Sequence, residues 1–449
     1  MPSVVTIKDG EKYRGHFYIR GARSSQIIYA KSLDEATNEA YRIEGMKLGI
    51  KQSEVSLKKT TVSKAYDDYL EGLRNQIKPI KPKTYEKYKK FGDYYIKRYF
   101  GDWRPDVLTV VDIQNYIDWL RSPDARMNKS KKKPLAPNTI AEAYSEMEVF
   151  LKHCQRLGII DENPCDKLRP GQKPTKEAVE VEWYHIDEIK KMIACLNEEV
   201  EHELNRLKEM EASGRYAKFT IMKDRTNILA HRLSIIFCFC AGCRRGEMLG
   251  LRRSDIYSNG KVRLCHNVCY TREEGVYEEN FLKNQKERYV YISQSLINLI
   301  KEYLDVLDET IECSDGRMQK TDRVFVSLVN TTRTTLGGLP NPDNYSDWFW
   351  DMLRRHDLRH VHFHALRHSF AAYCLHRGVS LFTLAKLTGH SNTKMIETTY
   401  GHLYDSDQEN VTRLFATIDS DTEEQEAQVD DVVEITNERE VVDLFEGII

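Results

Sequence analysis

The sequence predicts a multidomain protein that is mainly α-helical and carries small β-sheets. Most of the chain places apolar residues at helical spacing, while short alternating runs occur near the N-terminus and between residues 256 and 294. A chain of 449 residues with 41% hydrophobic composition also exceeds one typical domain. We therefore expect a small sheet with one helix, a helical domain, a mixed α/β but mostly helical domain, and an acidic tail, over residues 1–58, 59–172, 173–418 and 419–449.

The composition of the chain indicates the cellular compartment in which the protein acts. We find no run of about eighteen apolar residues, and the N-terminus lacks the apolar segment of a signal peptide. The ten cysteines show no compact spacing, which is typical of reduced thiols rather than disulfides. We expect a cytoplasmic protein without membrane contact.

Charge is distributed unevenly, although the net charge is only -2. Residues 1–176 carry 34 Lys and Arg against 23 Asp and Glu, whereas residues 419–449 carry one Arg against 12 acids. This asymmetry indicates a polyanion-binding surface and a separate contact or regulatory segment.

Residues 1–58 open with KYRGHFYIRG and SSQIIYAKSL, two alternating runs, followed by a helical DEATNEAYRIEGMKLG. The basic side chains here belong to Lys12, Arg14, Arg20 and Arg23. On composition alone, a solvated sheet face is favoured over a DNA-binding one.

Residues 59–172 show four helical segments separated by Pro- and Lys-rich loops. An aromatic stripe at helical spacing favours packing for the rings, and the lysines between them can face phosphate. The stripe comprises Tyr85, Tyr88, Tyr94 and Tyr95. Asn163-Pro164 and residues 168–171 indicate a linker.

The next domain begins with a charged helical extension at residues 196–225, for which a solvated insertion and a contact arm both remain open. The apolar run ILAHRLSIIFCFC then predicts a buried helix leading into AGCRRGEMLGLRRSDI. By spacing alone, Arg244 and Glu247 would form an ordinary surface salt bridge. We expect Cys240 and Cys243 to be buried as small apolar residues rather than to bind zinc.

Residues 363–403 concentrate the residues suited to catalysis. If residues 364–377 are helical, His364, Arg367 and His368 share one face. Gly378 ends this helix, Ser380 can cap the next, and His390 and Tyr400 follow. A guanidinium and imidazoles can hold a phosphate while a tyrosine hydroxyl attacks it and conserves the bond energy in a covalent intermediate.

These residues form H-x-L-R-H, then L-x-G-H, then Tyr, an order that closely resembles the signature of the tyrosine recombinases, the phage integrase family. The GCRRGEMLGL segment resembles the family's first box, which implies that Arg244 is the first catalytic arginine and Glu247 its supporting acid. Arg245 is the alternative. L-K-N-x-K-x-R-x-V-x-I resembles the hairpin that carries the family's lysine acid and implies Lys283, with Lys286 as the alternative.

The resemblance implies a site-specific DNA recombinase. Its catalytic residues would be Arg244, Lys283, His364, Arg367, His390 and Tyr400, supported by Glu247 and His368. It further implies a prokaryotic protein in which residues 59–172 resemble the core-binding domain and residues 1–58 an arm-site domain. The partners would be double-stranded DNA at core and arm sites, three further protomers in a tetramer, and an accessory DNA-bending protein, without metal or cofactor.

Alternatives remain open. The chain could be a catalytically silent DNA-binding regulator or a chromosome or plasmid dimer resolvase, and Tyr404 could replace Tyr400 as nucleophile. His360, His362 and His364 alternate as zinc ligands on a strand would, but lack a Cys or carboxylate partner at metal spacing.

The tail ends in VVDLFEGII, which is too apolar for a purely disordered acidic segment. We expect residues 441–449 to pack on a neighbouring protomer or over the basic surface.

Overall fold

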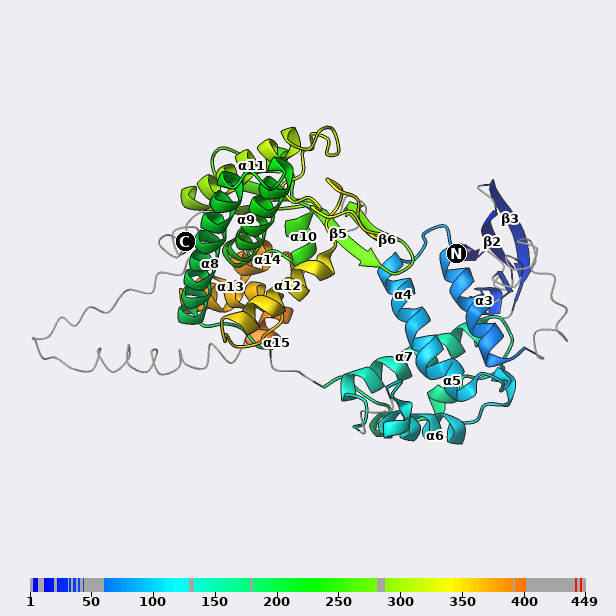
Figure 1. Cartoon of the computed structure of the whole chain (residues 1–449). Coiled ribbons are helices and arrows are strands. Elements are labelled where there is room, and N and C mark those ends of the chain that lie inside the picture. The colour runs from blue at the N-terminus through cyan, green and yellow to red at the C-terminus, as the bar shows by residue number, and fades with distance from the viewer. Residues whose placement is uncertain are drawn as a thin grey trace, which may run out of the picture. The chain divides into compact units, whose positions relative to one another are not determined.

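The structure is a computed structural model that describes residues 3–6, 12–19, 22–30, parts of 32–43, 60–128, 133–177, 181–280, 287–390 and 392–400, with Val441 and Phe445. The chain divides into two compact units, residues 1–179 and 180–449. Both units are mainly helical with small sheets, which confirms the predicted fold class (Figure 1).

The N-terminal sheet contains β1 (Ser3–Thr6), β2 (Lys12–Ile19) and β3 (Ala22–Tyr29), antiparallel in that order. Arg14 pairs with Ile27, and both side chains are exposed, whereas Tyr13 and Ile28 are buried on the opposite face. This inner face packs with the helical residues Ala36, Ala40 and Ile43. Strand alternation therefore gives the sheet one core face and one open face.

The helices of the first unit form a separate core. They are α3 (Val62–Arg74), α4 (Pro82–Phe91), the π-helical turn η1 (Gly92–Ile96), α5 (Lys97–Phe100), α6 (Val110–Arg121) and α7 (Pro137–Arg156). Thr109 and Asp112 form a capping box that begins α6, which satisfies backbone groups at that end. Tyr95 is buried and Tyr85, Tyr88 and Tyr94 pack against this core, as the aromatic stripe predicted.

The second unit is built around α9 (Lys218–Ala241), which packs against α8 (Ile186–Ala212), α11 (Gln294–Glu312) and α13 (Ala365–His376) (Figure 1). The C-terminal half of α9 is buried on all sides, because its apolar residues do not segregate to one face. The remaining helices are α10 (Arg245–Leu249), α12 (Pro342–Arg355), α14 (Leu381–Thr388) and α15 (Lys394–Tyr400). Residues 196–225 thus lie mostly in α8 and α9, where Leu207 is buried.

Two small antiparallel sheets complete this unit. β4 (Lys261–Leu264) pairs with β7 (Arg288–Tyr291), and β5 (His266–Thr271) pairs with β6 (Gly275–Asn280). The segment that joins β6 to β7 carries Lys283 and Lys286, and both lie outside the described residues.

Short 3-10 helices occupy several connections. They are η2 (Pro105–Val107), η3 (Pro123–Ala125), η4 (Pro164–Lys167), η5 (Pro170–Gln172) and η6 (Arg253–Asp255). Four of them begin with proline, whose fixed φ suits a first helical position. Among the described helices, none is both long and apolar enough to cross a membrane.

The two described residues of the tail, Val441 and Phe445, are buried in the core of the second unit. The Phe445 ring stacks on Phe370 at 5.3 Å and also meets Phe239 and Tyr373. Phe445 therefore contacts an apolar surface of its own chain and not a basic one, because its ring has aromatic partners on α9 and α13. Contact of this segment with a neighbouring protomer stays a prediction.

Candidate active site

The first part of the site is the turn after α9. Gly242 ends this helix in the left-handed conformation, with φ of 57°, and a Cβ there would lie 2.3 Å from the Phe370 ring. Glycine is therefore required twice, by conformation and by space. The turn places Arg244 at the start of α10, where Glu247 accepts hydrogen bonds from its backbone nitrogen and from its Nη1, both at 2.8 Å.

Glu247 is held by a second arginine that the sequence analysis did not select. Arg288 of β7 donates from Nη1 and Nη2 to the two carboxylate oxygens at 2.7 and 2.6 Å, and from Nε to the carbonyl of Leu387 at 2.8 Å. Burial alone would raise the pKa of Glu247, but the charges of Arg288 and Arg244 overcome it and hold the pKa at about 2. The only signal for Arg288 in the sequence is the arginine of the K-x-R pattern on the hairpin.

Arg367 lies at the centre of the site and is almost fully buried. Its Nη1 donates to the carbonyl of Gly242 at 2.9 Å, and its Nη2 lies 3.3 Å from Nε2 of His390. Burial and the charge of Arg244 lower the pKa of Arg367. The two arginines and His390 therefore belong to one positively charged cluster.

The hydrogen bonds of His390 fix how its ring is used. Thr388 donates its hydroxyl proton to the carbonyl of Leu384 at 2.6 Å, so its oxygen accepts from Nδ1 of His390 at 2.8 Å. In the neutral ring this leaves Nε2 as the unprotonated nitrogen beside Arg367. Burial and the neighbouring arginines lower the pKa of His390 to about 4.

Tyr400, at the end of α15, is buried with its hydroxyl 2.5 Å from Nδ1 of His368. Burial raises the pKa of Tyr400 and lowers that of His368 to about 4, so near neutral pH an uncharged imidazole accepts the hydrogen bond of a neutral phenol. The His364 ring lies edge-on to His368 at 4.8 Å and is partly exposed to solvent. Desolvation by the neighbouring side chains is the main cause that lowers the pKa of His364, and the charges of His368, Arg367 and Arg244 lower it further.

The structure thus brings together seven of the eight residues predicted for the site. These seven residues form one cluster, through the contacts given above: Arg244, Glu247, His364, Arg367, His368, His390 and Tyr400. Arg245 turns away, toward Ser346 and Asp343 of α12. Lys283, its alternative Lys286 and Tyr404 all lie outside the described residues.

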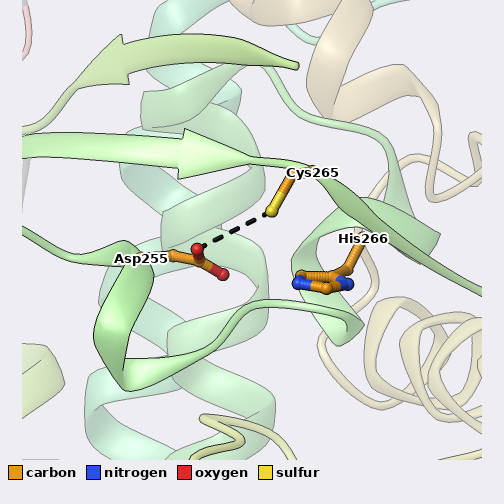
Figure 2. Close-up of side chains that lie close together, drawn as sticks. All are labelled: Asp255, Cys265 and His266. Carbon is orange, nitrogen blue, oxygen red and sulfur yellow. Dashed lines mark hydrogen bonds between the residues drawn. The ribbon is translucent and has the colours of Figure 1, made fainter. Parts of the chain in front are cut away.

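One cluster outside this site has side chains of metal-binding types. Asp255, Cys265 and His266 place potential ligand atoms within 4.8 Å of one another, as Figure 2 shows. However, Arg263 binds Asp255 from Nε at 2.9 Å, and His266 lies 2.6 Å from a carboxylate oxygen of Glu278. Burial raises the pKa of Cys265 to about 11, which disfavours the thiolate that a metal requires. This arrangement favours an ion-pair network over a metal centre.

The cysteines near Arg244 have a structural role. Cys240 and Cys243 are free thiols buried in the core around α9, as expected for small apolar residues. Burial raises the pKa of Cys240, so its thiolate is disfavoured.

Comparison with known proteins matches two regions of this chain to one family. Residues 215–407 match the phage integrase family and residues 61–169 the phage integrase SAM-like domain. The chain is 26% identical over 340 residues to a tyrosine recombinase XerC-like protein of Caldanaerobacter subterraneus, covering 72% of this chain and 75% of that protein. It is 24% identical over 305 residues to transposase A from transposon Tn554 of Staphylococcus aureus, covering 66% and 76%.

The fold is also that of solved integrases. A structure of the Tn1549 transposon integrase in complex with a circular intermediate DNA aligns with a TM-score of 0.54 at 15% identity, covering 79% of this chain and 99% of that one. With the matched domains and the pocket of arginines, histidines and tyrosine, these findings show that the chain belongs to the phage integrase family of tyrosine recombinases, enzymes that break and rejoin DNA strands.

Proposed function

We propose that Tyr400 is the nucleophile of this recombinase. Its oxygen attacks the scissile phosphate, the bond from phosphorus to the 5′ oxygen breaks, and a 3′-phosphotyrosyl bond forms. His368 accepts the tyrosine proton, and Lys283 protonates the departing 5′ oxygen. Because the broken bond's energy is kept in the new ester, the reverse attack by another 5′ hydroxyl joins the strands.

The proposal depends mainly on the pairing of Arg367 with His390, 3.3 Å apart in a pocket that also holds the charge of Arg244. A phosphate group that is being transferred is stabilised by positive charges and hydrogen-bond donors that are already in position before the reaction. In this proposal, Arg244, Arg367 and His364 bind the non-bridging oxygens, and the unprotonated Nε2 of His390 accepts a hydrogen bond from Arg367 and so orients that guanidinium toward the phosphate. Glu247 is not a ligand, since its carboxylate is occupied by Arg244 and Arg288.

The other domains would position DNA. The helical domain of residues 59–172 would bind the core site, and the sheet of residues 1–58 would bind arm sites through its open face, where Arg14 is exposed and Lys12 lies 5.9 Å from the Tyr29 ring. Arg20 lies outside the described residues, as does the side chain of Arg23. We place this activity in the cytoplasm of a prokaryotic cell.

The biological reaction we propose is integration and excision of a mobile element. The relatives support this, since they include the transposase of Tn554 and an ICEBs1 integrase of Bacillus subtilis, the latter 27% identical over 174 residues. A tetramer on paired sites, with an accessory bending protein, completes the proposal. In it, the Phe445 segment exchanges its contact with Phe370 for the same contact on a neighbour.

A nicked suicide duplex tests the proposed chemistry. Cleavage next to the nick releases a short fragment, so the covalent adduct accumulates and survives SDS. With duplexes tiled across the gene's flanks, the wild type should form the adduct, and Tyr400→Phe should bind the same duplex without forming it. Equal adduct from both proteins would exclude Tyr400 as nucleophile.

A second variant tests the phosphate pocket. Arg367→Lys keeps the charge but loses the planar fork that reaches Gly242 and His390, so cleavage should fall by about 100-fold or more. Unchanged cleavage by Arg367→Lys would contradict the proposed phosphate pocket.

A further inference from the structure

A row of exposed rings lies beside the active site. From His360 to Ala365 the burial alternates, so that Val361 and Phe363 are buried whereas His360, His362 and His364 are exposed. The three imidazoles therefore lie on one side of the segment, and the last of them belongs to the phosphate pocket. The row thus leads away from the pocket along the surface of the second unit.

The first two imidazoles surround an exposed tryptophan. The indole of Trp350, on α12, lies 5.2 Å from the His360 ring and 5.9 Å from the His362 ring, and 37% of the residue is exposed. Within the described part of the chain, neither imidazole has a hydrogen-bond or ion-pair partner, so their ring nitrogens remain available to a ligand.

The segment that carries these rings is fixed from its inner side. Phe363 packs against Phe349 of α12 with ring centroids 5.2 Å apart. The hydroxyl of Tyr184 donates to the carbonyl of Arg359 at 3.0 Å and accepts from the backbone nitrogen of Val361 at 3.2 Å. A tryptophan and two histidines on a fixed backbone form a preorganised surface, which lowers the entropy cost of binding.

We propose that Trp350, His360 and His362 contact the sugar-phosphate backbone of the DNA strand next to the scissile phosphate. Two to four residues of chain span at most about 7 to 14 Å, and a turn at Phe363 and His364 shortens this, because the backbone nitrogen of Ala365 donates to the carbonyl of His362 at 2.7 Å. One DNA strand rises about 3.4 Å per phosphate, so the row reaches no farther than about four nucleotides from the pocket. The imidazoles donate to phosphate oxygens, and the indole packs against a deoxyribose. This inference rests on the recombinase activity proposed above, because that activity brings DNA to His364.

The binding test compares Trp350→Ala and the double variant His360→Ala/His362→Ala with a control, Tyr216→Ala. Tyr216 is also exposed, but it precedes α9, whose 24 residues separate it from Gly242 by about 36 Å. The full-length proteins are titrated with the duplexes used above. We expect Trp350→Ala to weaken binding about tenfold, as the loss of a central aromatic contact does, while Tyr216→Ala binds as the wild type does.

Single methylphosphonate substitutions, which remove the charge of one phosphate, then locate the contact. At one position within about four nucleotides of the cleavage point, the substitution should weaken the wild type and leave the double histidine variant unaffected, because the two changes remove the same interaction. Folding is checked by the melting temperature and by Trp350→Phe, which keeps a ring and should retain most of the binding.

Each outcome of these experiments either supports or overturns the proposed contact between the three rings and the DNA backbone. Equal binding by the wild type and Trp350→Ala, or equal sensitivity of the wild type and the double variant at every phosphate, would overturn it. If DNA binding is unchanged but the oligomer dissociates, the surface contacts a protein instead, which also overturns it. A wild type that binds but forms no adduct would contradict the proposed recombinase chemistry, whereas the binding comparison would still decide this inference.

Discussion

Replacing Arg288 tests how the pocket is held together. Arg288→Met keeps much of the side-chain volume but removes both bonds to Glu247 and the bond to Leu387. Glu247 is only 1% exposed, so losing one partner leaves a buried carboxylate with Arg244 as its remaining cation. Breaking a buried ion pair typically costs about 3 to 5 kcal/mol. Because Arg244 still compensates part of the charge, we expect the free energy of unfolding to fall by about 3 kcal/mol.

The assay is thermal unfolding of the full-length protein. For a unit of this size, a loss of about 3 kcal/mol corresponds to roughly 6 to 12 °C in Tm. Arg253→Met is the matched control, since Arg253 also forms two bonds to one carboxylate, Asp308, at 2.7 and 2.6 Å. The Asp308 side chain is 49% exposed, so this variant should lose about 1 kcal/mol at most. If Arg288→Met lowers Tm no more than Arg253→Met, the reasoning about the buried carboxylate is refuted.

Three further predictions concern Gly242, His368 and Glu146. Gly242→Ala combines a strained φ with a contact to Phe370 and should lower the free energy of unfolding by about 2 kcal/mol or more. Gly214→Ala is the control, because Gly214 also has a positive φ but lies in open space, and it should lower the free energy of unfolding by about 1 kcal/mol. Equal losses of Tm in the two variants would contradict the packing argument. Because the pKa of His368 is lowered to about 4, the ring stays neutral above that value, so the single-turnover cleavage rate should be flat from about pH 6 to 8 and fall as pH approaches 4. A rate that changes steadily between pH 6 and 8 would refute His368 as the proton acceptor. Burial raises the pKa of Glu146 to about 7, with Tyr66 donating to it at 2.9 Å, so the folded protein binds this proton more tightly than the unfolded chain does. The stabilisation that Glu146 contributes is fully present below about pH 4.5, and about 3 kcal/mol of it is lost as the pH rises through about 7. Glu146→Gln should remove this loss, so its Tm at pH 8 should exceed that of the wild type. Identical pH profiles of Tm for the two proteins would contradict the raised pKa of Glu146.

Local patterns in the sequence predicted much of the fold. Helical spacing, Gly378 and Ser380 indicated where helices begin and end, because caps and left-handed turns depend on residues close in sequence. The order of the motifs likewise indicated which arginines and histidines would meet.

The remaining features depend on contacts between distant segments. Arg288 binds a carboxylate 41 residues earlier in the chain, which no local pattern specifies. The same holds for Arg245, whose partners lie on α12, and for the burial of Phe445 between α9 and α13. Hydrogen bonds also decided which nitrogen of His390 faces Arg367, since the sequence cannot show that Thr388 uses its proton elsewhere.

The most direct test of the central claim is to identify the amino acid that becomes linked to DNA. Trypsin should release residues 395–413 as one peptide, which contains both Tyr400 and Tyr404. Tandem mass spectrometry of the nuclease-trimmed adduct can place the remaining nucleotide on one of the two side chains. We predict that it is on Tyr400, whereas a nucleotide on Tyr404 would contradict the assignment of the nucleophile.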